Sequence, residues 1–227
     1  TYSWEILLPI TFSLIFITLG VMIAWAVSES ITREVWNEKL FSVDLFYNGY
    51  FTHSKVGKGI VRGTGFGFLI LSCWLILGTI VNSFVTLSIL PFNGDTSEFT
   101  TSFHSLFVFT KSFNQTLFPS SLMFLFLASI IKLRTRKNIW IILTVGIVFG
   151  LISSGAFRPL YIGIPINIIL GCILTYIFIK YDYLTVFVSI MVYYSLSIAV
   201  SYFYIDTNVI GYSHIFYLGI ISLIYIV

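Results

Sequence analysis

The feature that most constrains this chain is a succession of long apolar runs without charged side chains in their middles. There are seven: residues 6–27, 60–85, 113–131, 139–156, 160–179, 184–204 and 210–227. Runs of about 18 or more apolar residues are long enough to cross a membrane as α-helices. Backbone polar groups in lipid must be satisfied within such a helix. The sequence therefore predicts an all-α, polytopic membrane bundle of seven transmembrane helices, with residues 1–227 as one domain.

The composition supports a membrane protein and excludes an ordinary soluble domain. Hydrophobic residues make up 58% of the 227-residue chain and charged residues only 9%, whereas soluble domains carry about 25% charged residues. A chain with lipid-facing and core-facing surfaces needs apolar side chains on both. The two cysteines, Cys73 and Cys172, lie inside apolar runs, and we expect inert buried thiols there rather than a disulfide or a zinc site.

Lysine and arginine fall almost entirely on one side of the predicted bundle. Ten of the 12 basic residues lie in three alternate loops, whereas Lys111 and Arg158 lie on the other side. The ten are Arg33, Lys39, Lys55, Lys58, Arg62, Lys132, Arg134, Arg136, Lys137 and Lys180. Cytoplasmic loops carry the excess of positive charge. This bias predicts an N-terminus outside the membrane and three loops in the cytoplasm.

The longest polar stretch, residues 28–59, separates the first two runs and is predicted to be a cytoplasmic amphipathic loop. Its first part, about residues 28–46, places apolar side chains such as Trp36 and Leu40 among charges. That pattern predicts a helix lying at the membrane interface. The tripeptide Asn48-Gly49-Tyr50 then predicts a turn.

The middles of the seven runs contain no Asp, Glu, Lys, Arg or His. Proton relays, ion pumps and intramembrane metalloproteases need carboxylates or histidines at depth. His104 and His214 lie on the predicted outer side without a carboxylate at ligand spacing. We therefore expect no metal, no cofactor and no catalytic residue in this chain.

A compact basic cluster follows the third run and consists of Lys132, Arg134, Arg136 and Lys137. Its main role is expected to be anchoring the topology through anionic headgroups, at about 1 kcal/mol per basic residue. The cluster is short and lies against the bilayer, so we expect no nucleic-acid partner.

Glycines at positions 57–67 suggest a phosphate loop, but neither the preceding strand nor the closing Lys-Ser or Lys-Thr pair is present. Gly59, Gly63 and Gly67 are instead spaced four residues apart at the start of a run. This spacing predicts a helix-packing face on which neighbouring helices approach closely.

The outer side offers one candidate polar site. Arg158 is expected either to pair with Asp206 or Glu98 or to hold an anionic lipid or substrate. Gly163 and Pro165 are candidates for bending the fifth helix around a cavity. These residues support an alternative function: a transporter or permease component with a site near the outer ends of spans four and five.

Three stretches together resemble a known type of membrane region. They are residues 51–59, Phe-Thr-His-Ser-Lys-Val-Gly-Lys-Gly; the basic hairpin 132–138 with the pair of runs in 160–204; and residues 203–212. In this combination, over about residues 50–227, the chain resembles the polytopic membrane region attached to some bacterial Ser/Thr protein kinases. The resemblance implies that a separate kinase domain carries the catalysis, because none of its motifs is found here.

The resulting hypothesis is a non-catalytic module of the bacterial cytoplasmic membrane. It acts as an anchor, a sensor or a subunit of a larger membrane complex. Its expected partners are membrane lipids and either other protein subunits or a cytosolic domain, and we expect the whole chain to be longer than residues 1–227.

Overall fold

The computed structural model describes residues 3–85, 88–89, 104–135, 137–153 and 157–203. These residues are all-α apart from one two-residue antiparallel pair, β1 (Ser88–Ile89) with β2 (Phe157–Arg158). The helices are α1 (Ser3–Trp36), the 3-10 helix η1 (Asn37–Lys39), α2 (Phe41–Tyr47), α3 (Ser54–Asn82), α4 (His104–Ser120), the π-helix η4 (Ser121–Leu127), α5 (Ala128–Arg134), α6 (Asn138–Ile152), α7 (Leu160–Lys180) and α8 (Tyr183–Phe203). The predicted all-α class is confirmed.

Three stretches of helix within the described residues are long and apolar enough to cross a membrane, which indicates membrane association. They are Ser54–Asn82, Ser112–Arg134 and Leu160–Lys180. Seven were expected. The apolar stretches Asn138–Ile152 and Tyr183–Ser197 are shorter; at 15 residues, α6 spans only about 22 Å, against a hydrocarbon core of about 30 Å. The predicted run 210–227 lies outside the described residues.

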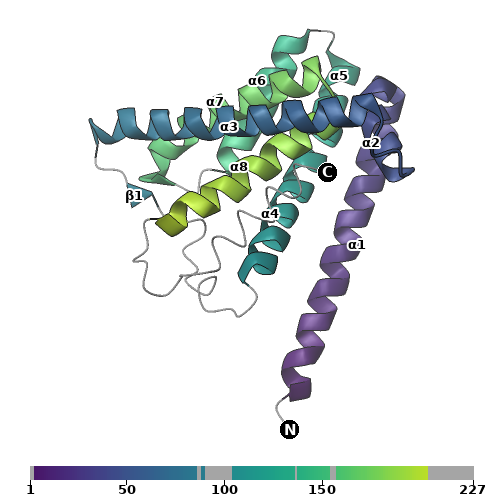
Figure 1. The fold of residues 1–227 in the computed structure, drawn as a ribbon, viewed down its shortest axis with the longest axis horizontal. Helices are drawn as coiled ribbons and strands as arrows, with labels where there is room; N and C mark the ends of the chain where they lie inside the picture. The colour runs from purple at the N-terminus through teal and green to yellow at the C-terminus, as the bar shows by residue number, and fades with distance from the viewer. Residues whose placement is uncertain (1–2, 86–87, 90–103, 136, 154–156, 204–227) are drawn as a thin grey trace.

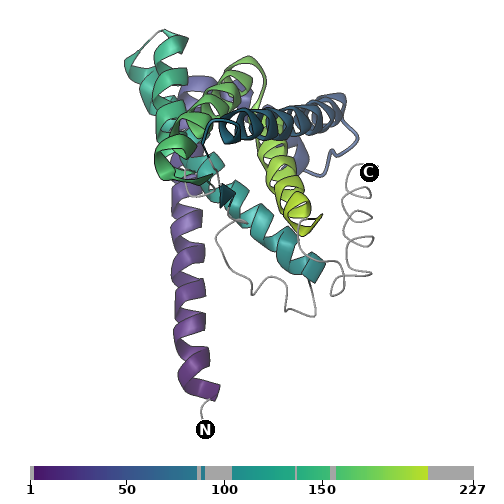
Figure 2. The ribbon, with the colours of Figure 1, turned by 90° about the vertical axis from the view of Figure 1, so that its left-hand side faces the viewer.

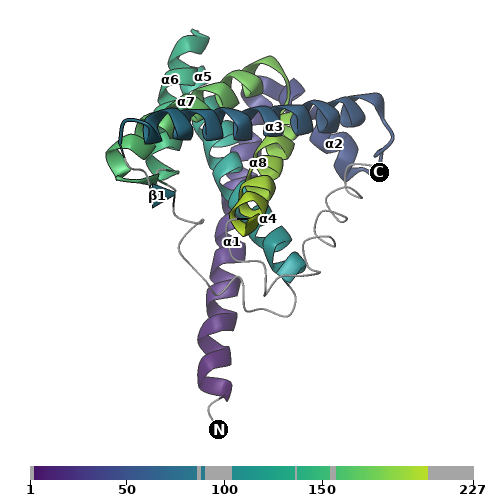
Figure 3. The ribbon, with the colours of Figure 1, turned by 60° about the vertical axis from the view of Figure 1, so that its left-hand side comes forward.

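The helices meet where α1 turns into α2, and from there α1 and α4 diverge from α3. In Figure 1, α3 and α7 run close to the horizontal, whereas α1 and α4 descend steeply and α8 lies obliquely between the two directions. The N-terminal half of α1 stands clear of the other coloured helices in all three ribbon views (Figures 1, 2 and 3). Neighbouring pairs are α3 with α8, α6 with α7, α4 with α8, and α1 with η4.

Two helix pairs approach closely because glycines lie between them. A Cβ atom added to Gly63 would lie 2.7 Å from the Cβ of Val188 and 2.8 Å from the carbonyl oxygen of Thr185, both on α8. Gly146 of α6 faces Cys172 of α7 in the same way, with the nearest backbone atom 3.0 Å from an added Cβ. The backbones of these pairs are therefore in direct contact, as in small-residue packing of membrane helices.

The segment after the first apolar run differs from the prediction. Instead of a separate interfacial helix over 28–46, α1 continues unbroken to Trp36. An ion pair between Glu29 and Arg33, at helical i,i+4 spacing, supports the continuation. The chain turns only afterwards, through η1 into the seven-residue helix α2.

The predicted turn after α2 forms at Asn48-Gly49-Tyr50. Gly49 adopts a φ of 81°, a conformation that glycine takes without steric cost. The amide of Tyr50 donates to the carbonyl of Leu45 at 2.9 Å and that of Gly49 to the carbonyl of Phe46 at 3.1 Å. This pair of bonds is a Schellman motif, which ends α2.

The basic end as candidate functional site

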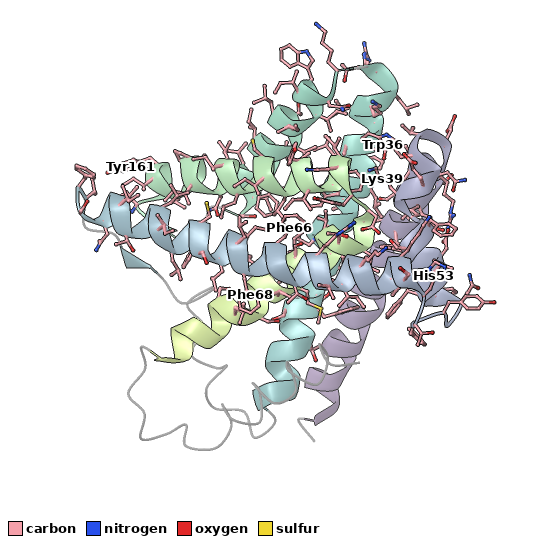
Figure 4. All side chains as sticks on the ribbon, turned by 45° about the horizontal axis from the view of Figure 1, so that its top comes forward. Trp36, Lys39, His53, Phe66, Phe68 and Tyr161 are labelled. Carbon is pink, nitrogen blue, oxygen red and sulfur yellow. The ribbon has the colours of Figure 1, made fainter. Side chains whose placement is uncertain are left out.

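The three basic loops meet at one end of the molecule, which we call the basic end. Its described basic residues are Arg33, Lys39, Lys55, Lys58, Arg62, Lys132, Arg134, Lys137 and Lys180. Lys39 in the first loop bonds to the third, and Lys132 in the second lies over a ring of the first. Figure 4 shows Trp36, Lys39 and His53 at this end and Tyr161 at the opposite end.

Lys39 is the central contact of the basic end. Its side chain is only 7% exposed, and its Nζ donates to the carbonyl oxygens of Ile179 at 2.7 Å and Tyr181 at 2.5 Å. These are carbonyls at the C-terminus of α7, where the helix dipole favours a cation. Burial lowers the pKa of Lys39 below its ordinary value, partly offset by the nearby carboxylates of Glu38 and Asp182. A buried lysine therefore fixes the end of α1 to the α7–α8 turn.

Arg33 joins α1 to α2 through two carboxylates. Its guanidinium donates to Asp44 at 2.5 and 3.0 Å and to Glu29 at 2.8 and 2.9 Å. Hydrogen bonds to Asp44 and then to Glu29 raise the pKa of Arg33. The other oxygen of Glu29 accepts from the indole of Trp25 at 2.9 Å. Arg33 is thus neutralised by its own neighbours and adds little to the positive field of the basic end.

Other cations of the basic end lie over aromatic rings. Lys132 lies 5.5 Å from the ring centroid of Trp36, and Arg62 lies 5.2 Å from that of Tyr181. Lys180 lies near the rings of Tyr176 and Tyr181. Such pairs contribute about 0.5–1 kcal/mol each at exposed sites. They bring α3, α5 and the end of α7 into the assembly that Lys39 begins.

Below this surface, a buried hydroxyl cluster connects α1 to the π-helix. Thr32 is fully buried, and its Oγ1 lies 2.8 Å from the carbonyl oxygens of both Ser28 and Leu125. The hydroxyl of Ser129 lies 3.1 Å away. A π-helix is rare, and such turns occur frequently at functional sites. Here it presents the Leu125 carbonyl to a side chain of another helix.

A second buried bond ties α4 to the start of α8. The hydroxyls of Ser120 and Tyr183 lie 2.8 Å apart, and both residues are buried. The ring of Tyr183 packs edge-on against Trp25 of α1 with centroids 5.7 Å apart. Three helices therefore meet at Tyr183, directly after the turn that Lys39 holds.

The structure places the predicted packing glycines on the α3 face that meets α8. Gly59, Gly63 and Gly67 are all buried, and the residues facing them include Leu184, Val188 and Val192.

The predicted lipid cluster is described in part. Lys132 donates to the side chain of Asn138 at 3.1 Å, and Arg134 and Lys137 are exposed. Arg136 lies outside the described residues. The proposed lipid contact of this cluster stays a prediction.

The predicted outer polar site lies partly outside the described residues, so the pairing of Arg158 stays a prediction. Arg158 lies in β2, paired through its backbone with Ser88, and Asp206 lies outside the described residues. Between α6 and α7, Asn167 donates to the carbonyls of Gly163 at 3.0 Å and Ser153 at 3.1 Å. This bond joins α6 to α7 where the alternative function places a substrate.

Sequence reasoning missed the role of Lys39. It treated this residue as one of ten loop charges, because the carbonyl partners lie about 140 residues further along the chain. The chain carries no local signal for such a contact. The ring partners of Arg62 and Lys132 were missed for the same reason.

Comparison with protein-family models, with curated proteins and with solved structures finds no match. Within the described residues, no group of three or more His, Cys, Asp or Glu side chains lies together as a potential metal site. Function is therefore inferred from the geometry of the basic end.

Proposed function

We propose that this chain is a non-catalytic, multi-pass module of the bacterial cytoplasmic membrane, with seven spans and its N-terminus outside. Its basic end faces the cytoplasm and serves as a rigid platform for a cytosolic domain or partner subunit. In this role the module acts as an anchor, a sensor or a subunit of a larger complex.

The observation that carries this proposal is the bond from buried Lys39 to the end of α7. It holds together loops that are distant in sequence and that contain most of the basic residues. A flexible set of anchoring charges needs no buried lysine, whose desolvation is costly. A fixed arrangement of helix ends suits the docking of a partner. The resemblance to kinase-attached membrane regions favours the same role.

The charges at the basic end suggest where a partner docks. Glu34 and Glu38 are exposed at the end of α1 and in η1, and the ion pairs of the described residues involve Glu29 and Asp44 instead. Positive charge is concentrated on the ends of α3, α5, α6 and α7. The basic side chains are expected to face anionic headgroups, so the acidic side of α1 stays available to a protein partner. We expect that partner to present basic groups to Glu34 and Glu38.

Orientation can be tested by cysteine labelling in intact cells with a membrane-impermeant maleimide. Lys137→Cys is expected to react only after permeabilisation, and Tyr161→Cys, at the opposite end, is expected to react from outside. The unmodified chain controls for Cys73 and Cys172. Labelling of Lys137→Cys in intact cells would refute the orientation.

Docking can be tested by purification from native membranes in mild detergent, with mass spectrometry of everything retained. Glu34→Gln/Glu38→Gln is expected to lose a partner that the parent chain retains, whereas Lys137→Gln keeps it. Equal retention by both variants would exclude docking on the α1 side. A parent chain that retains no protein and has no further domain would exclude the platform itself.

A further inference from the structure

The segment between η1 and α3 exposes an unusual number of aromatic side chains. We call residues 41–53 the elbow; it comprises α2, the Schellman turn and the residues leading to α3. Phe41, Phe46, Tyr47, Tyr50 and Phe51 are all exposed, Tyr47 to 90% and Tyr50 to 62%. An exposed cluster of this kind marks an interaction surface.

The elbow is held firmly from its inner side. Ser42 is buried, and Val43 packs against the hydrophobic core beside Leu40. On the outer side, the rings of Phe46 and Phe51 pack edge-on with centroids 5.0 Å apart. The aromatic side chains therefore project from a fixed turn.

The charges beside the elbow favour an anionic ligand. Lys55 lies 4.2 Å from the ring centroid of Phe41, and Lys58 is exposed one turn further along α3. The acidic residue of the elbow, Asp44, already accepts two bonds from Arg33. The aromatic surface is therefore bordered by two lysines whose charge no elbow carboxylate offsets.

With α3 as one of the proposed spans, its length and its basic first turns put the elbow at the membrane surface. This helix has 29 residues, or about 43 Å at 1.5 Å per residue, and a hydrocarbon core is only about 30 Å thick. Its first turns, which carry Lys55 and Lys58, therefore extend into the headgroup region. Aromatic side chains with polar tips are enriched at this depth.

We propose that the elbow is a binding surface for anionic phospholipid: its aromatic side chains enter the headgroup–acyl boundary while Lys55 and Lys58 contact the lipid phosphates. This inference rests on the proposed membrane module. It adds a specific lipid surface, distinct from the basic cluster at 132–137, that fixes the depth and rotation of α3.

The test uses the full chain with Tyr47→Trp as a fluorescent reporter, and the emission of the parent chain is subtracted. In maltoside micelles, phosphatidylglycerol is expected to change the added emission saturably, and phosphatidylcholine is not. Removing both charges in Lys55→Gln/Lys58→Gln is expected to weaken lipid binding, so that the half-saturating concentration of phosphatidylglycerol rises by about 30-fold. The control, Lys180→Gln, removes a charge of the basic end that lies outside both the elbow and the cluster at 132–137, and it leaves the titration unchanged.

Three results would overturn the proposal. Equal responses to both lipids would remove the role of the lysines, and a saturable response to inorganic phosphate would assign them to a free anion. The third test uses vesicles of phosphatidylcholine and phosphatidylglycerol in equal amounts. In these vesicles the proposal expects the added tryptophan to be shielded from aqueous iodide. Accessibility to iodide that ends only when cytosolic protein is added would assign the elbow to a protein partner. With iodide present on both faces of the bilayer, none of these readouts depends on orientation or on co-purification, so failure here is separate from failure of the platform.

Discussion

Adding one methyl group at the α3–α8 contact is the sharpest test of the packing. Alanine at Gly63 or Gly67 places a Cβ 2.6–2.7 Å from a Cβ of Val188 or Val192 and 2.8–2.9 Å from a backbone carbonyl. Neither neighbour is the free end of a flexible side chain. The two helices must therefore separate for the methyl group to fit.

The magnitude follows from comparison with a glycine on the same helix. Overpacking costs about 1–3 kcal/mol, and replacing a helical glycine by alanine gains about 1 kcal/mol in propensity. Gly63→Ala should therefore lower the free energy of unfolding by up to about 2 kcal/mol. Gly65 has nothing within 4 Å of an added Cβ, so Gly65→Ala should gain about 1 kcal/mol. At Gly59 the nearest atom is the movable Cδ2 of Leu184 at 3.3 Å, and a smaller loss is expected than at Gly63.

The assay is reversible unfolding in mixed micelles of maltoside and dodecyl sulfate, followed by helical circular dichroism. Because the propensity gain is common to both sites, the difference between Gly63→Ala and Gly65→Ala isolates the packing cost of about 1–3 kcal/mol. Equal stabilities of these two variants would refute a close α3–α8 contact. A loss at Gly65 alone would place the contact on the opposite face of α3.

Other buried bonds give further predictions in the same unfolding assay. Lys39→Met leaves two carbonyls unpaired and should cost about 1–3 kcal/mol; a neutral result would exclude Lys39 as a stabilising contact. Because burial lowers the pKa of Lys39, the unfolded chain binds more protons between the two pKa values, so the stability of the parent relative to Lys39→Met should rise with pH as the ordinary lysine value is approached. A falling difference would contradict this. Thr32→Val keeps the side-chain shape but removes the donor to Leu125, and should cost about 0.5–1.5 kcal/mol, unlike Thr64→Val on α3, whose hydroxyl bonds only within its own helix. Tyr183→Phe should cost a similar amount. Adding Ser120→Ala to that variant should lower the stability little further, because both substitutions remove the same hydrogen bond between the two hydroxyls.

Sequence reasoning anticipated the helices better than their arrangement. Apolar runs locate α3, α7 and α8 because lipid-facing and core-facing surfaces share one composition. The same composition hides which side of each helix faces a neighbour, and a run of 15 residues such as α6 is apolar enough for either a short span or a buried helix. The unbroken length of α1 was missed because charge was read as the end of a helix, although Glu29 and Arg33 form a helical pair.

The basic end was anticipated only as a charge bias. Alternation of spans predicts that the three loops share a side, and contacts of Lys39, Arg62 and Lys132 join them. Which lysine becomes buried cannot be read from the chain, because the partner is a backbone carbonyl and every residue carries one. The glycines at 59, 63 and 67 were more informative, because small residues at helical spacing directly specify close backbone approach.

The diverging bundle has a mechanical consequence for a module proposed to sense. The N-terminal half of α1 stands clear of the other helices, whereas β1 and β2 join the far ends of α3 and α7, so a displacement of that half of α1 is transmitted to the basic end (Figure 3). The α3–α8 contact is poorly suited to carry it, because glycine-packed backbones have little room to slide. The route through α4 contains the π-helix η4, which is less regular than α-helix. Conversion of one η4 turn to α-helix would rotate α5 and Lys132, and the Thr32 bond to Leu125 couples α1 to that change.

We therefore expect any signal to reach the basic end along α1 and η4. Spin-label distances between α1 and α5 that respond to Thr32→Val, while those between α3 and α8 do not, would support this route, and the reverse pattern would exclude it.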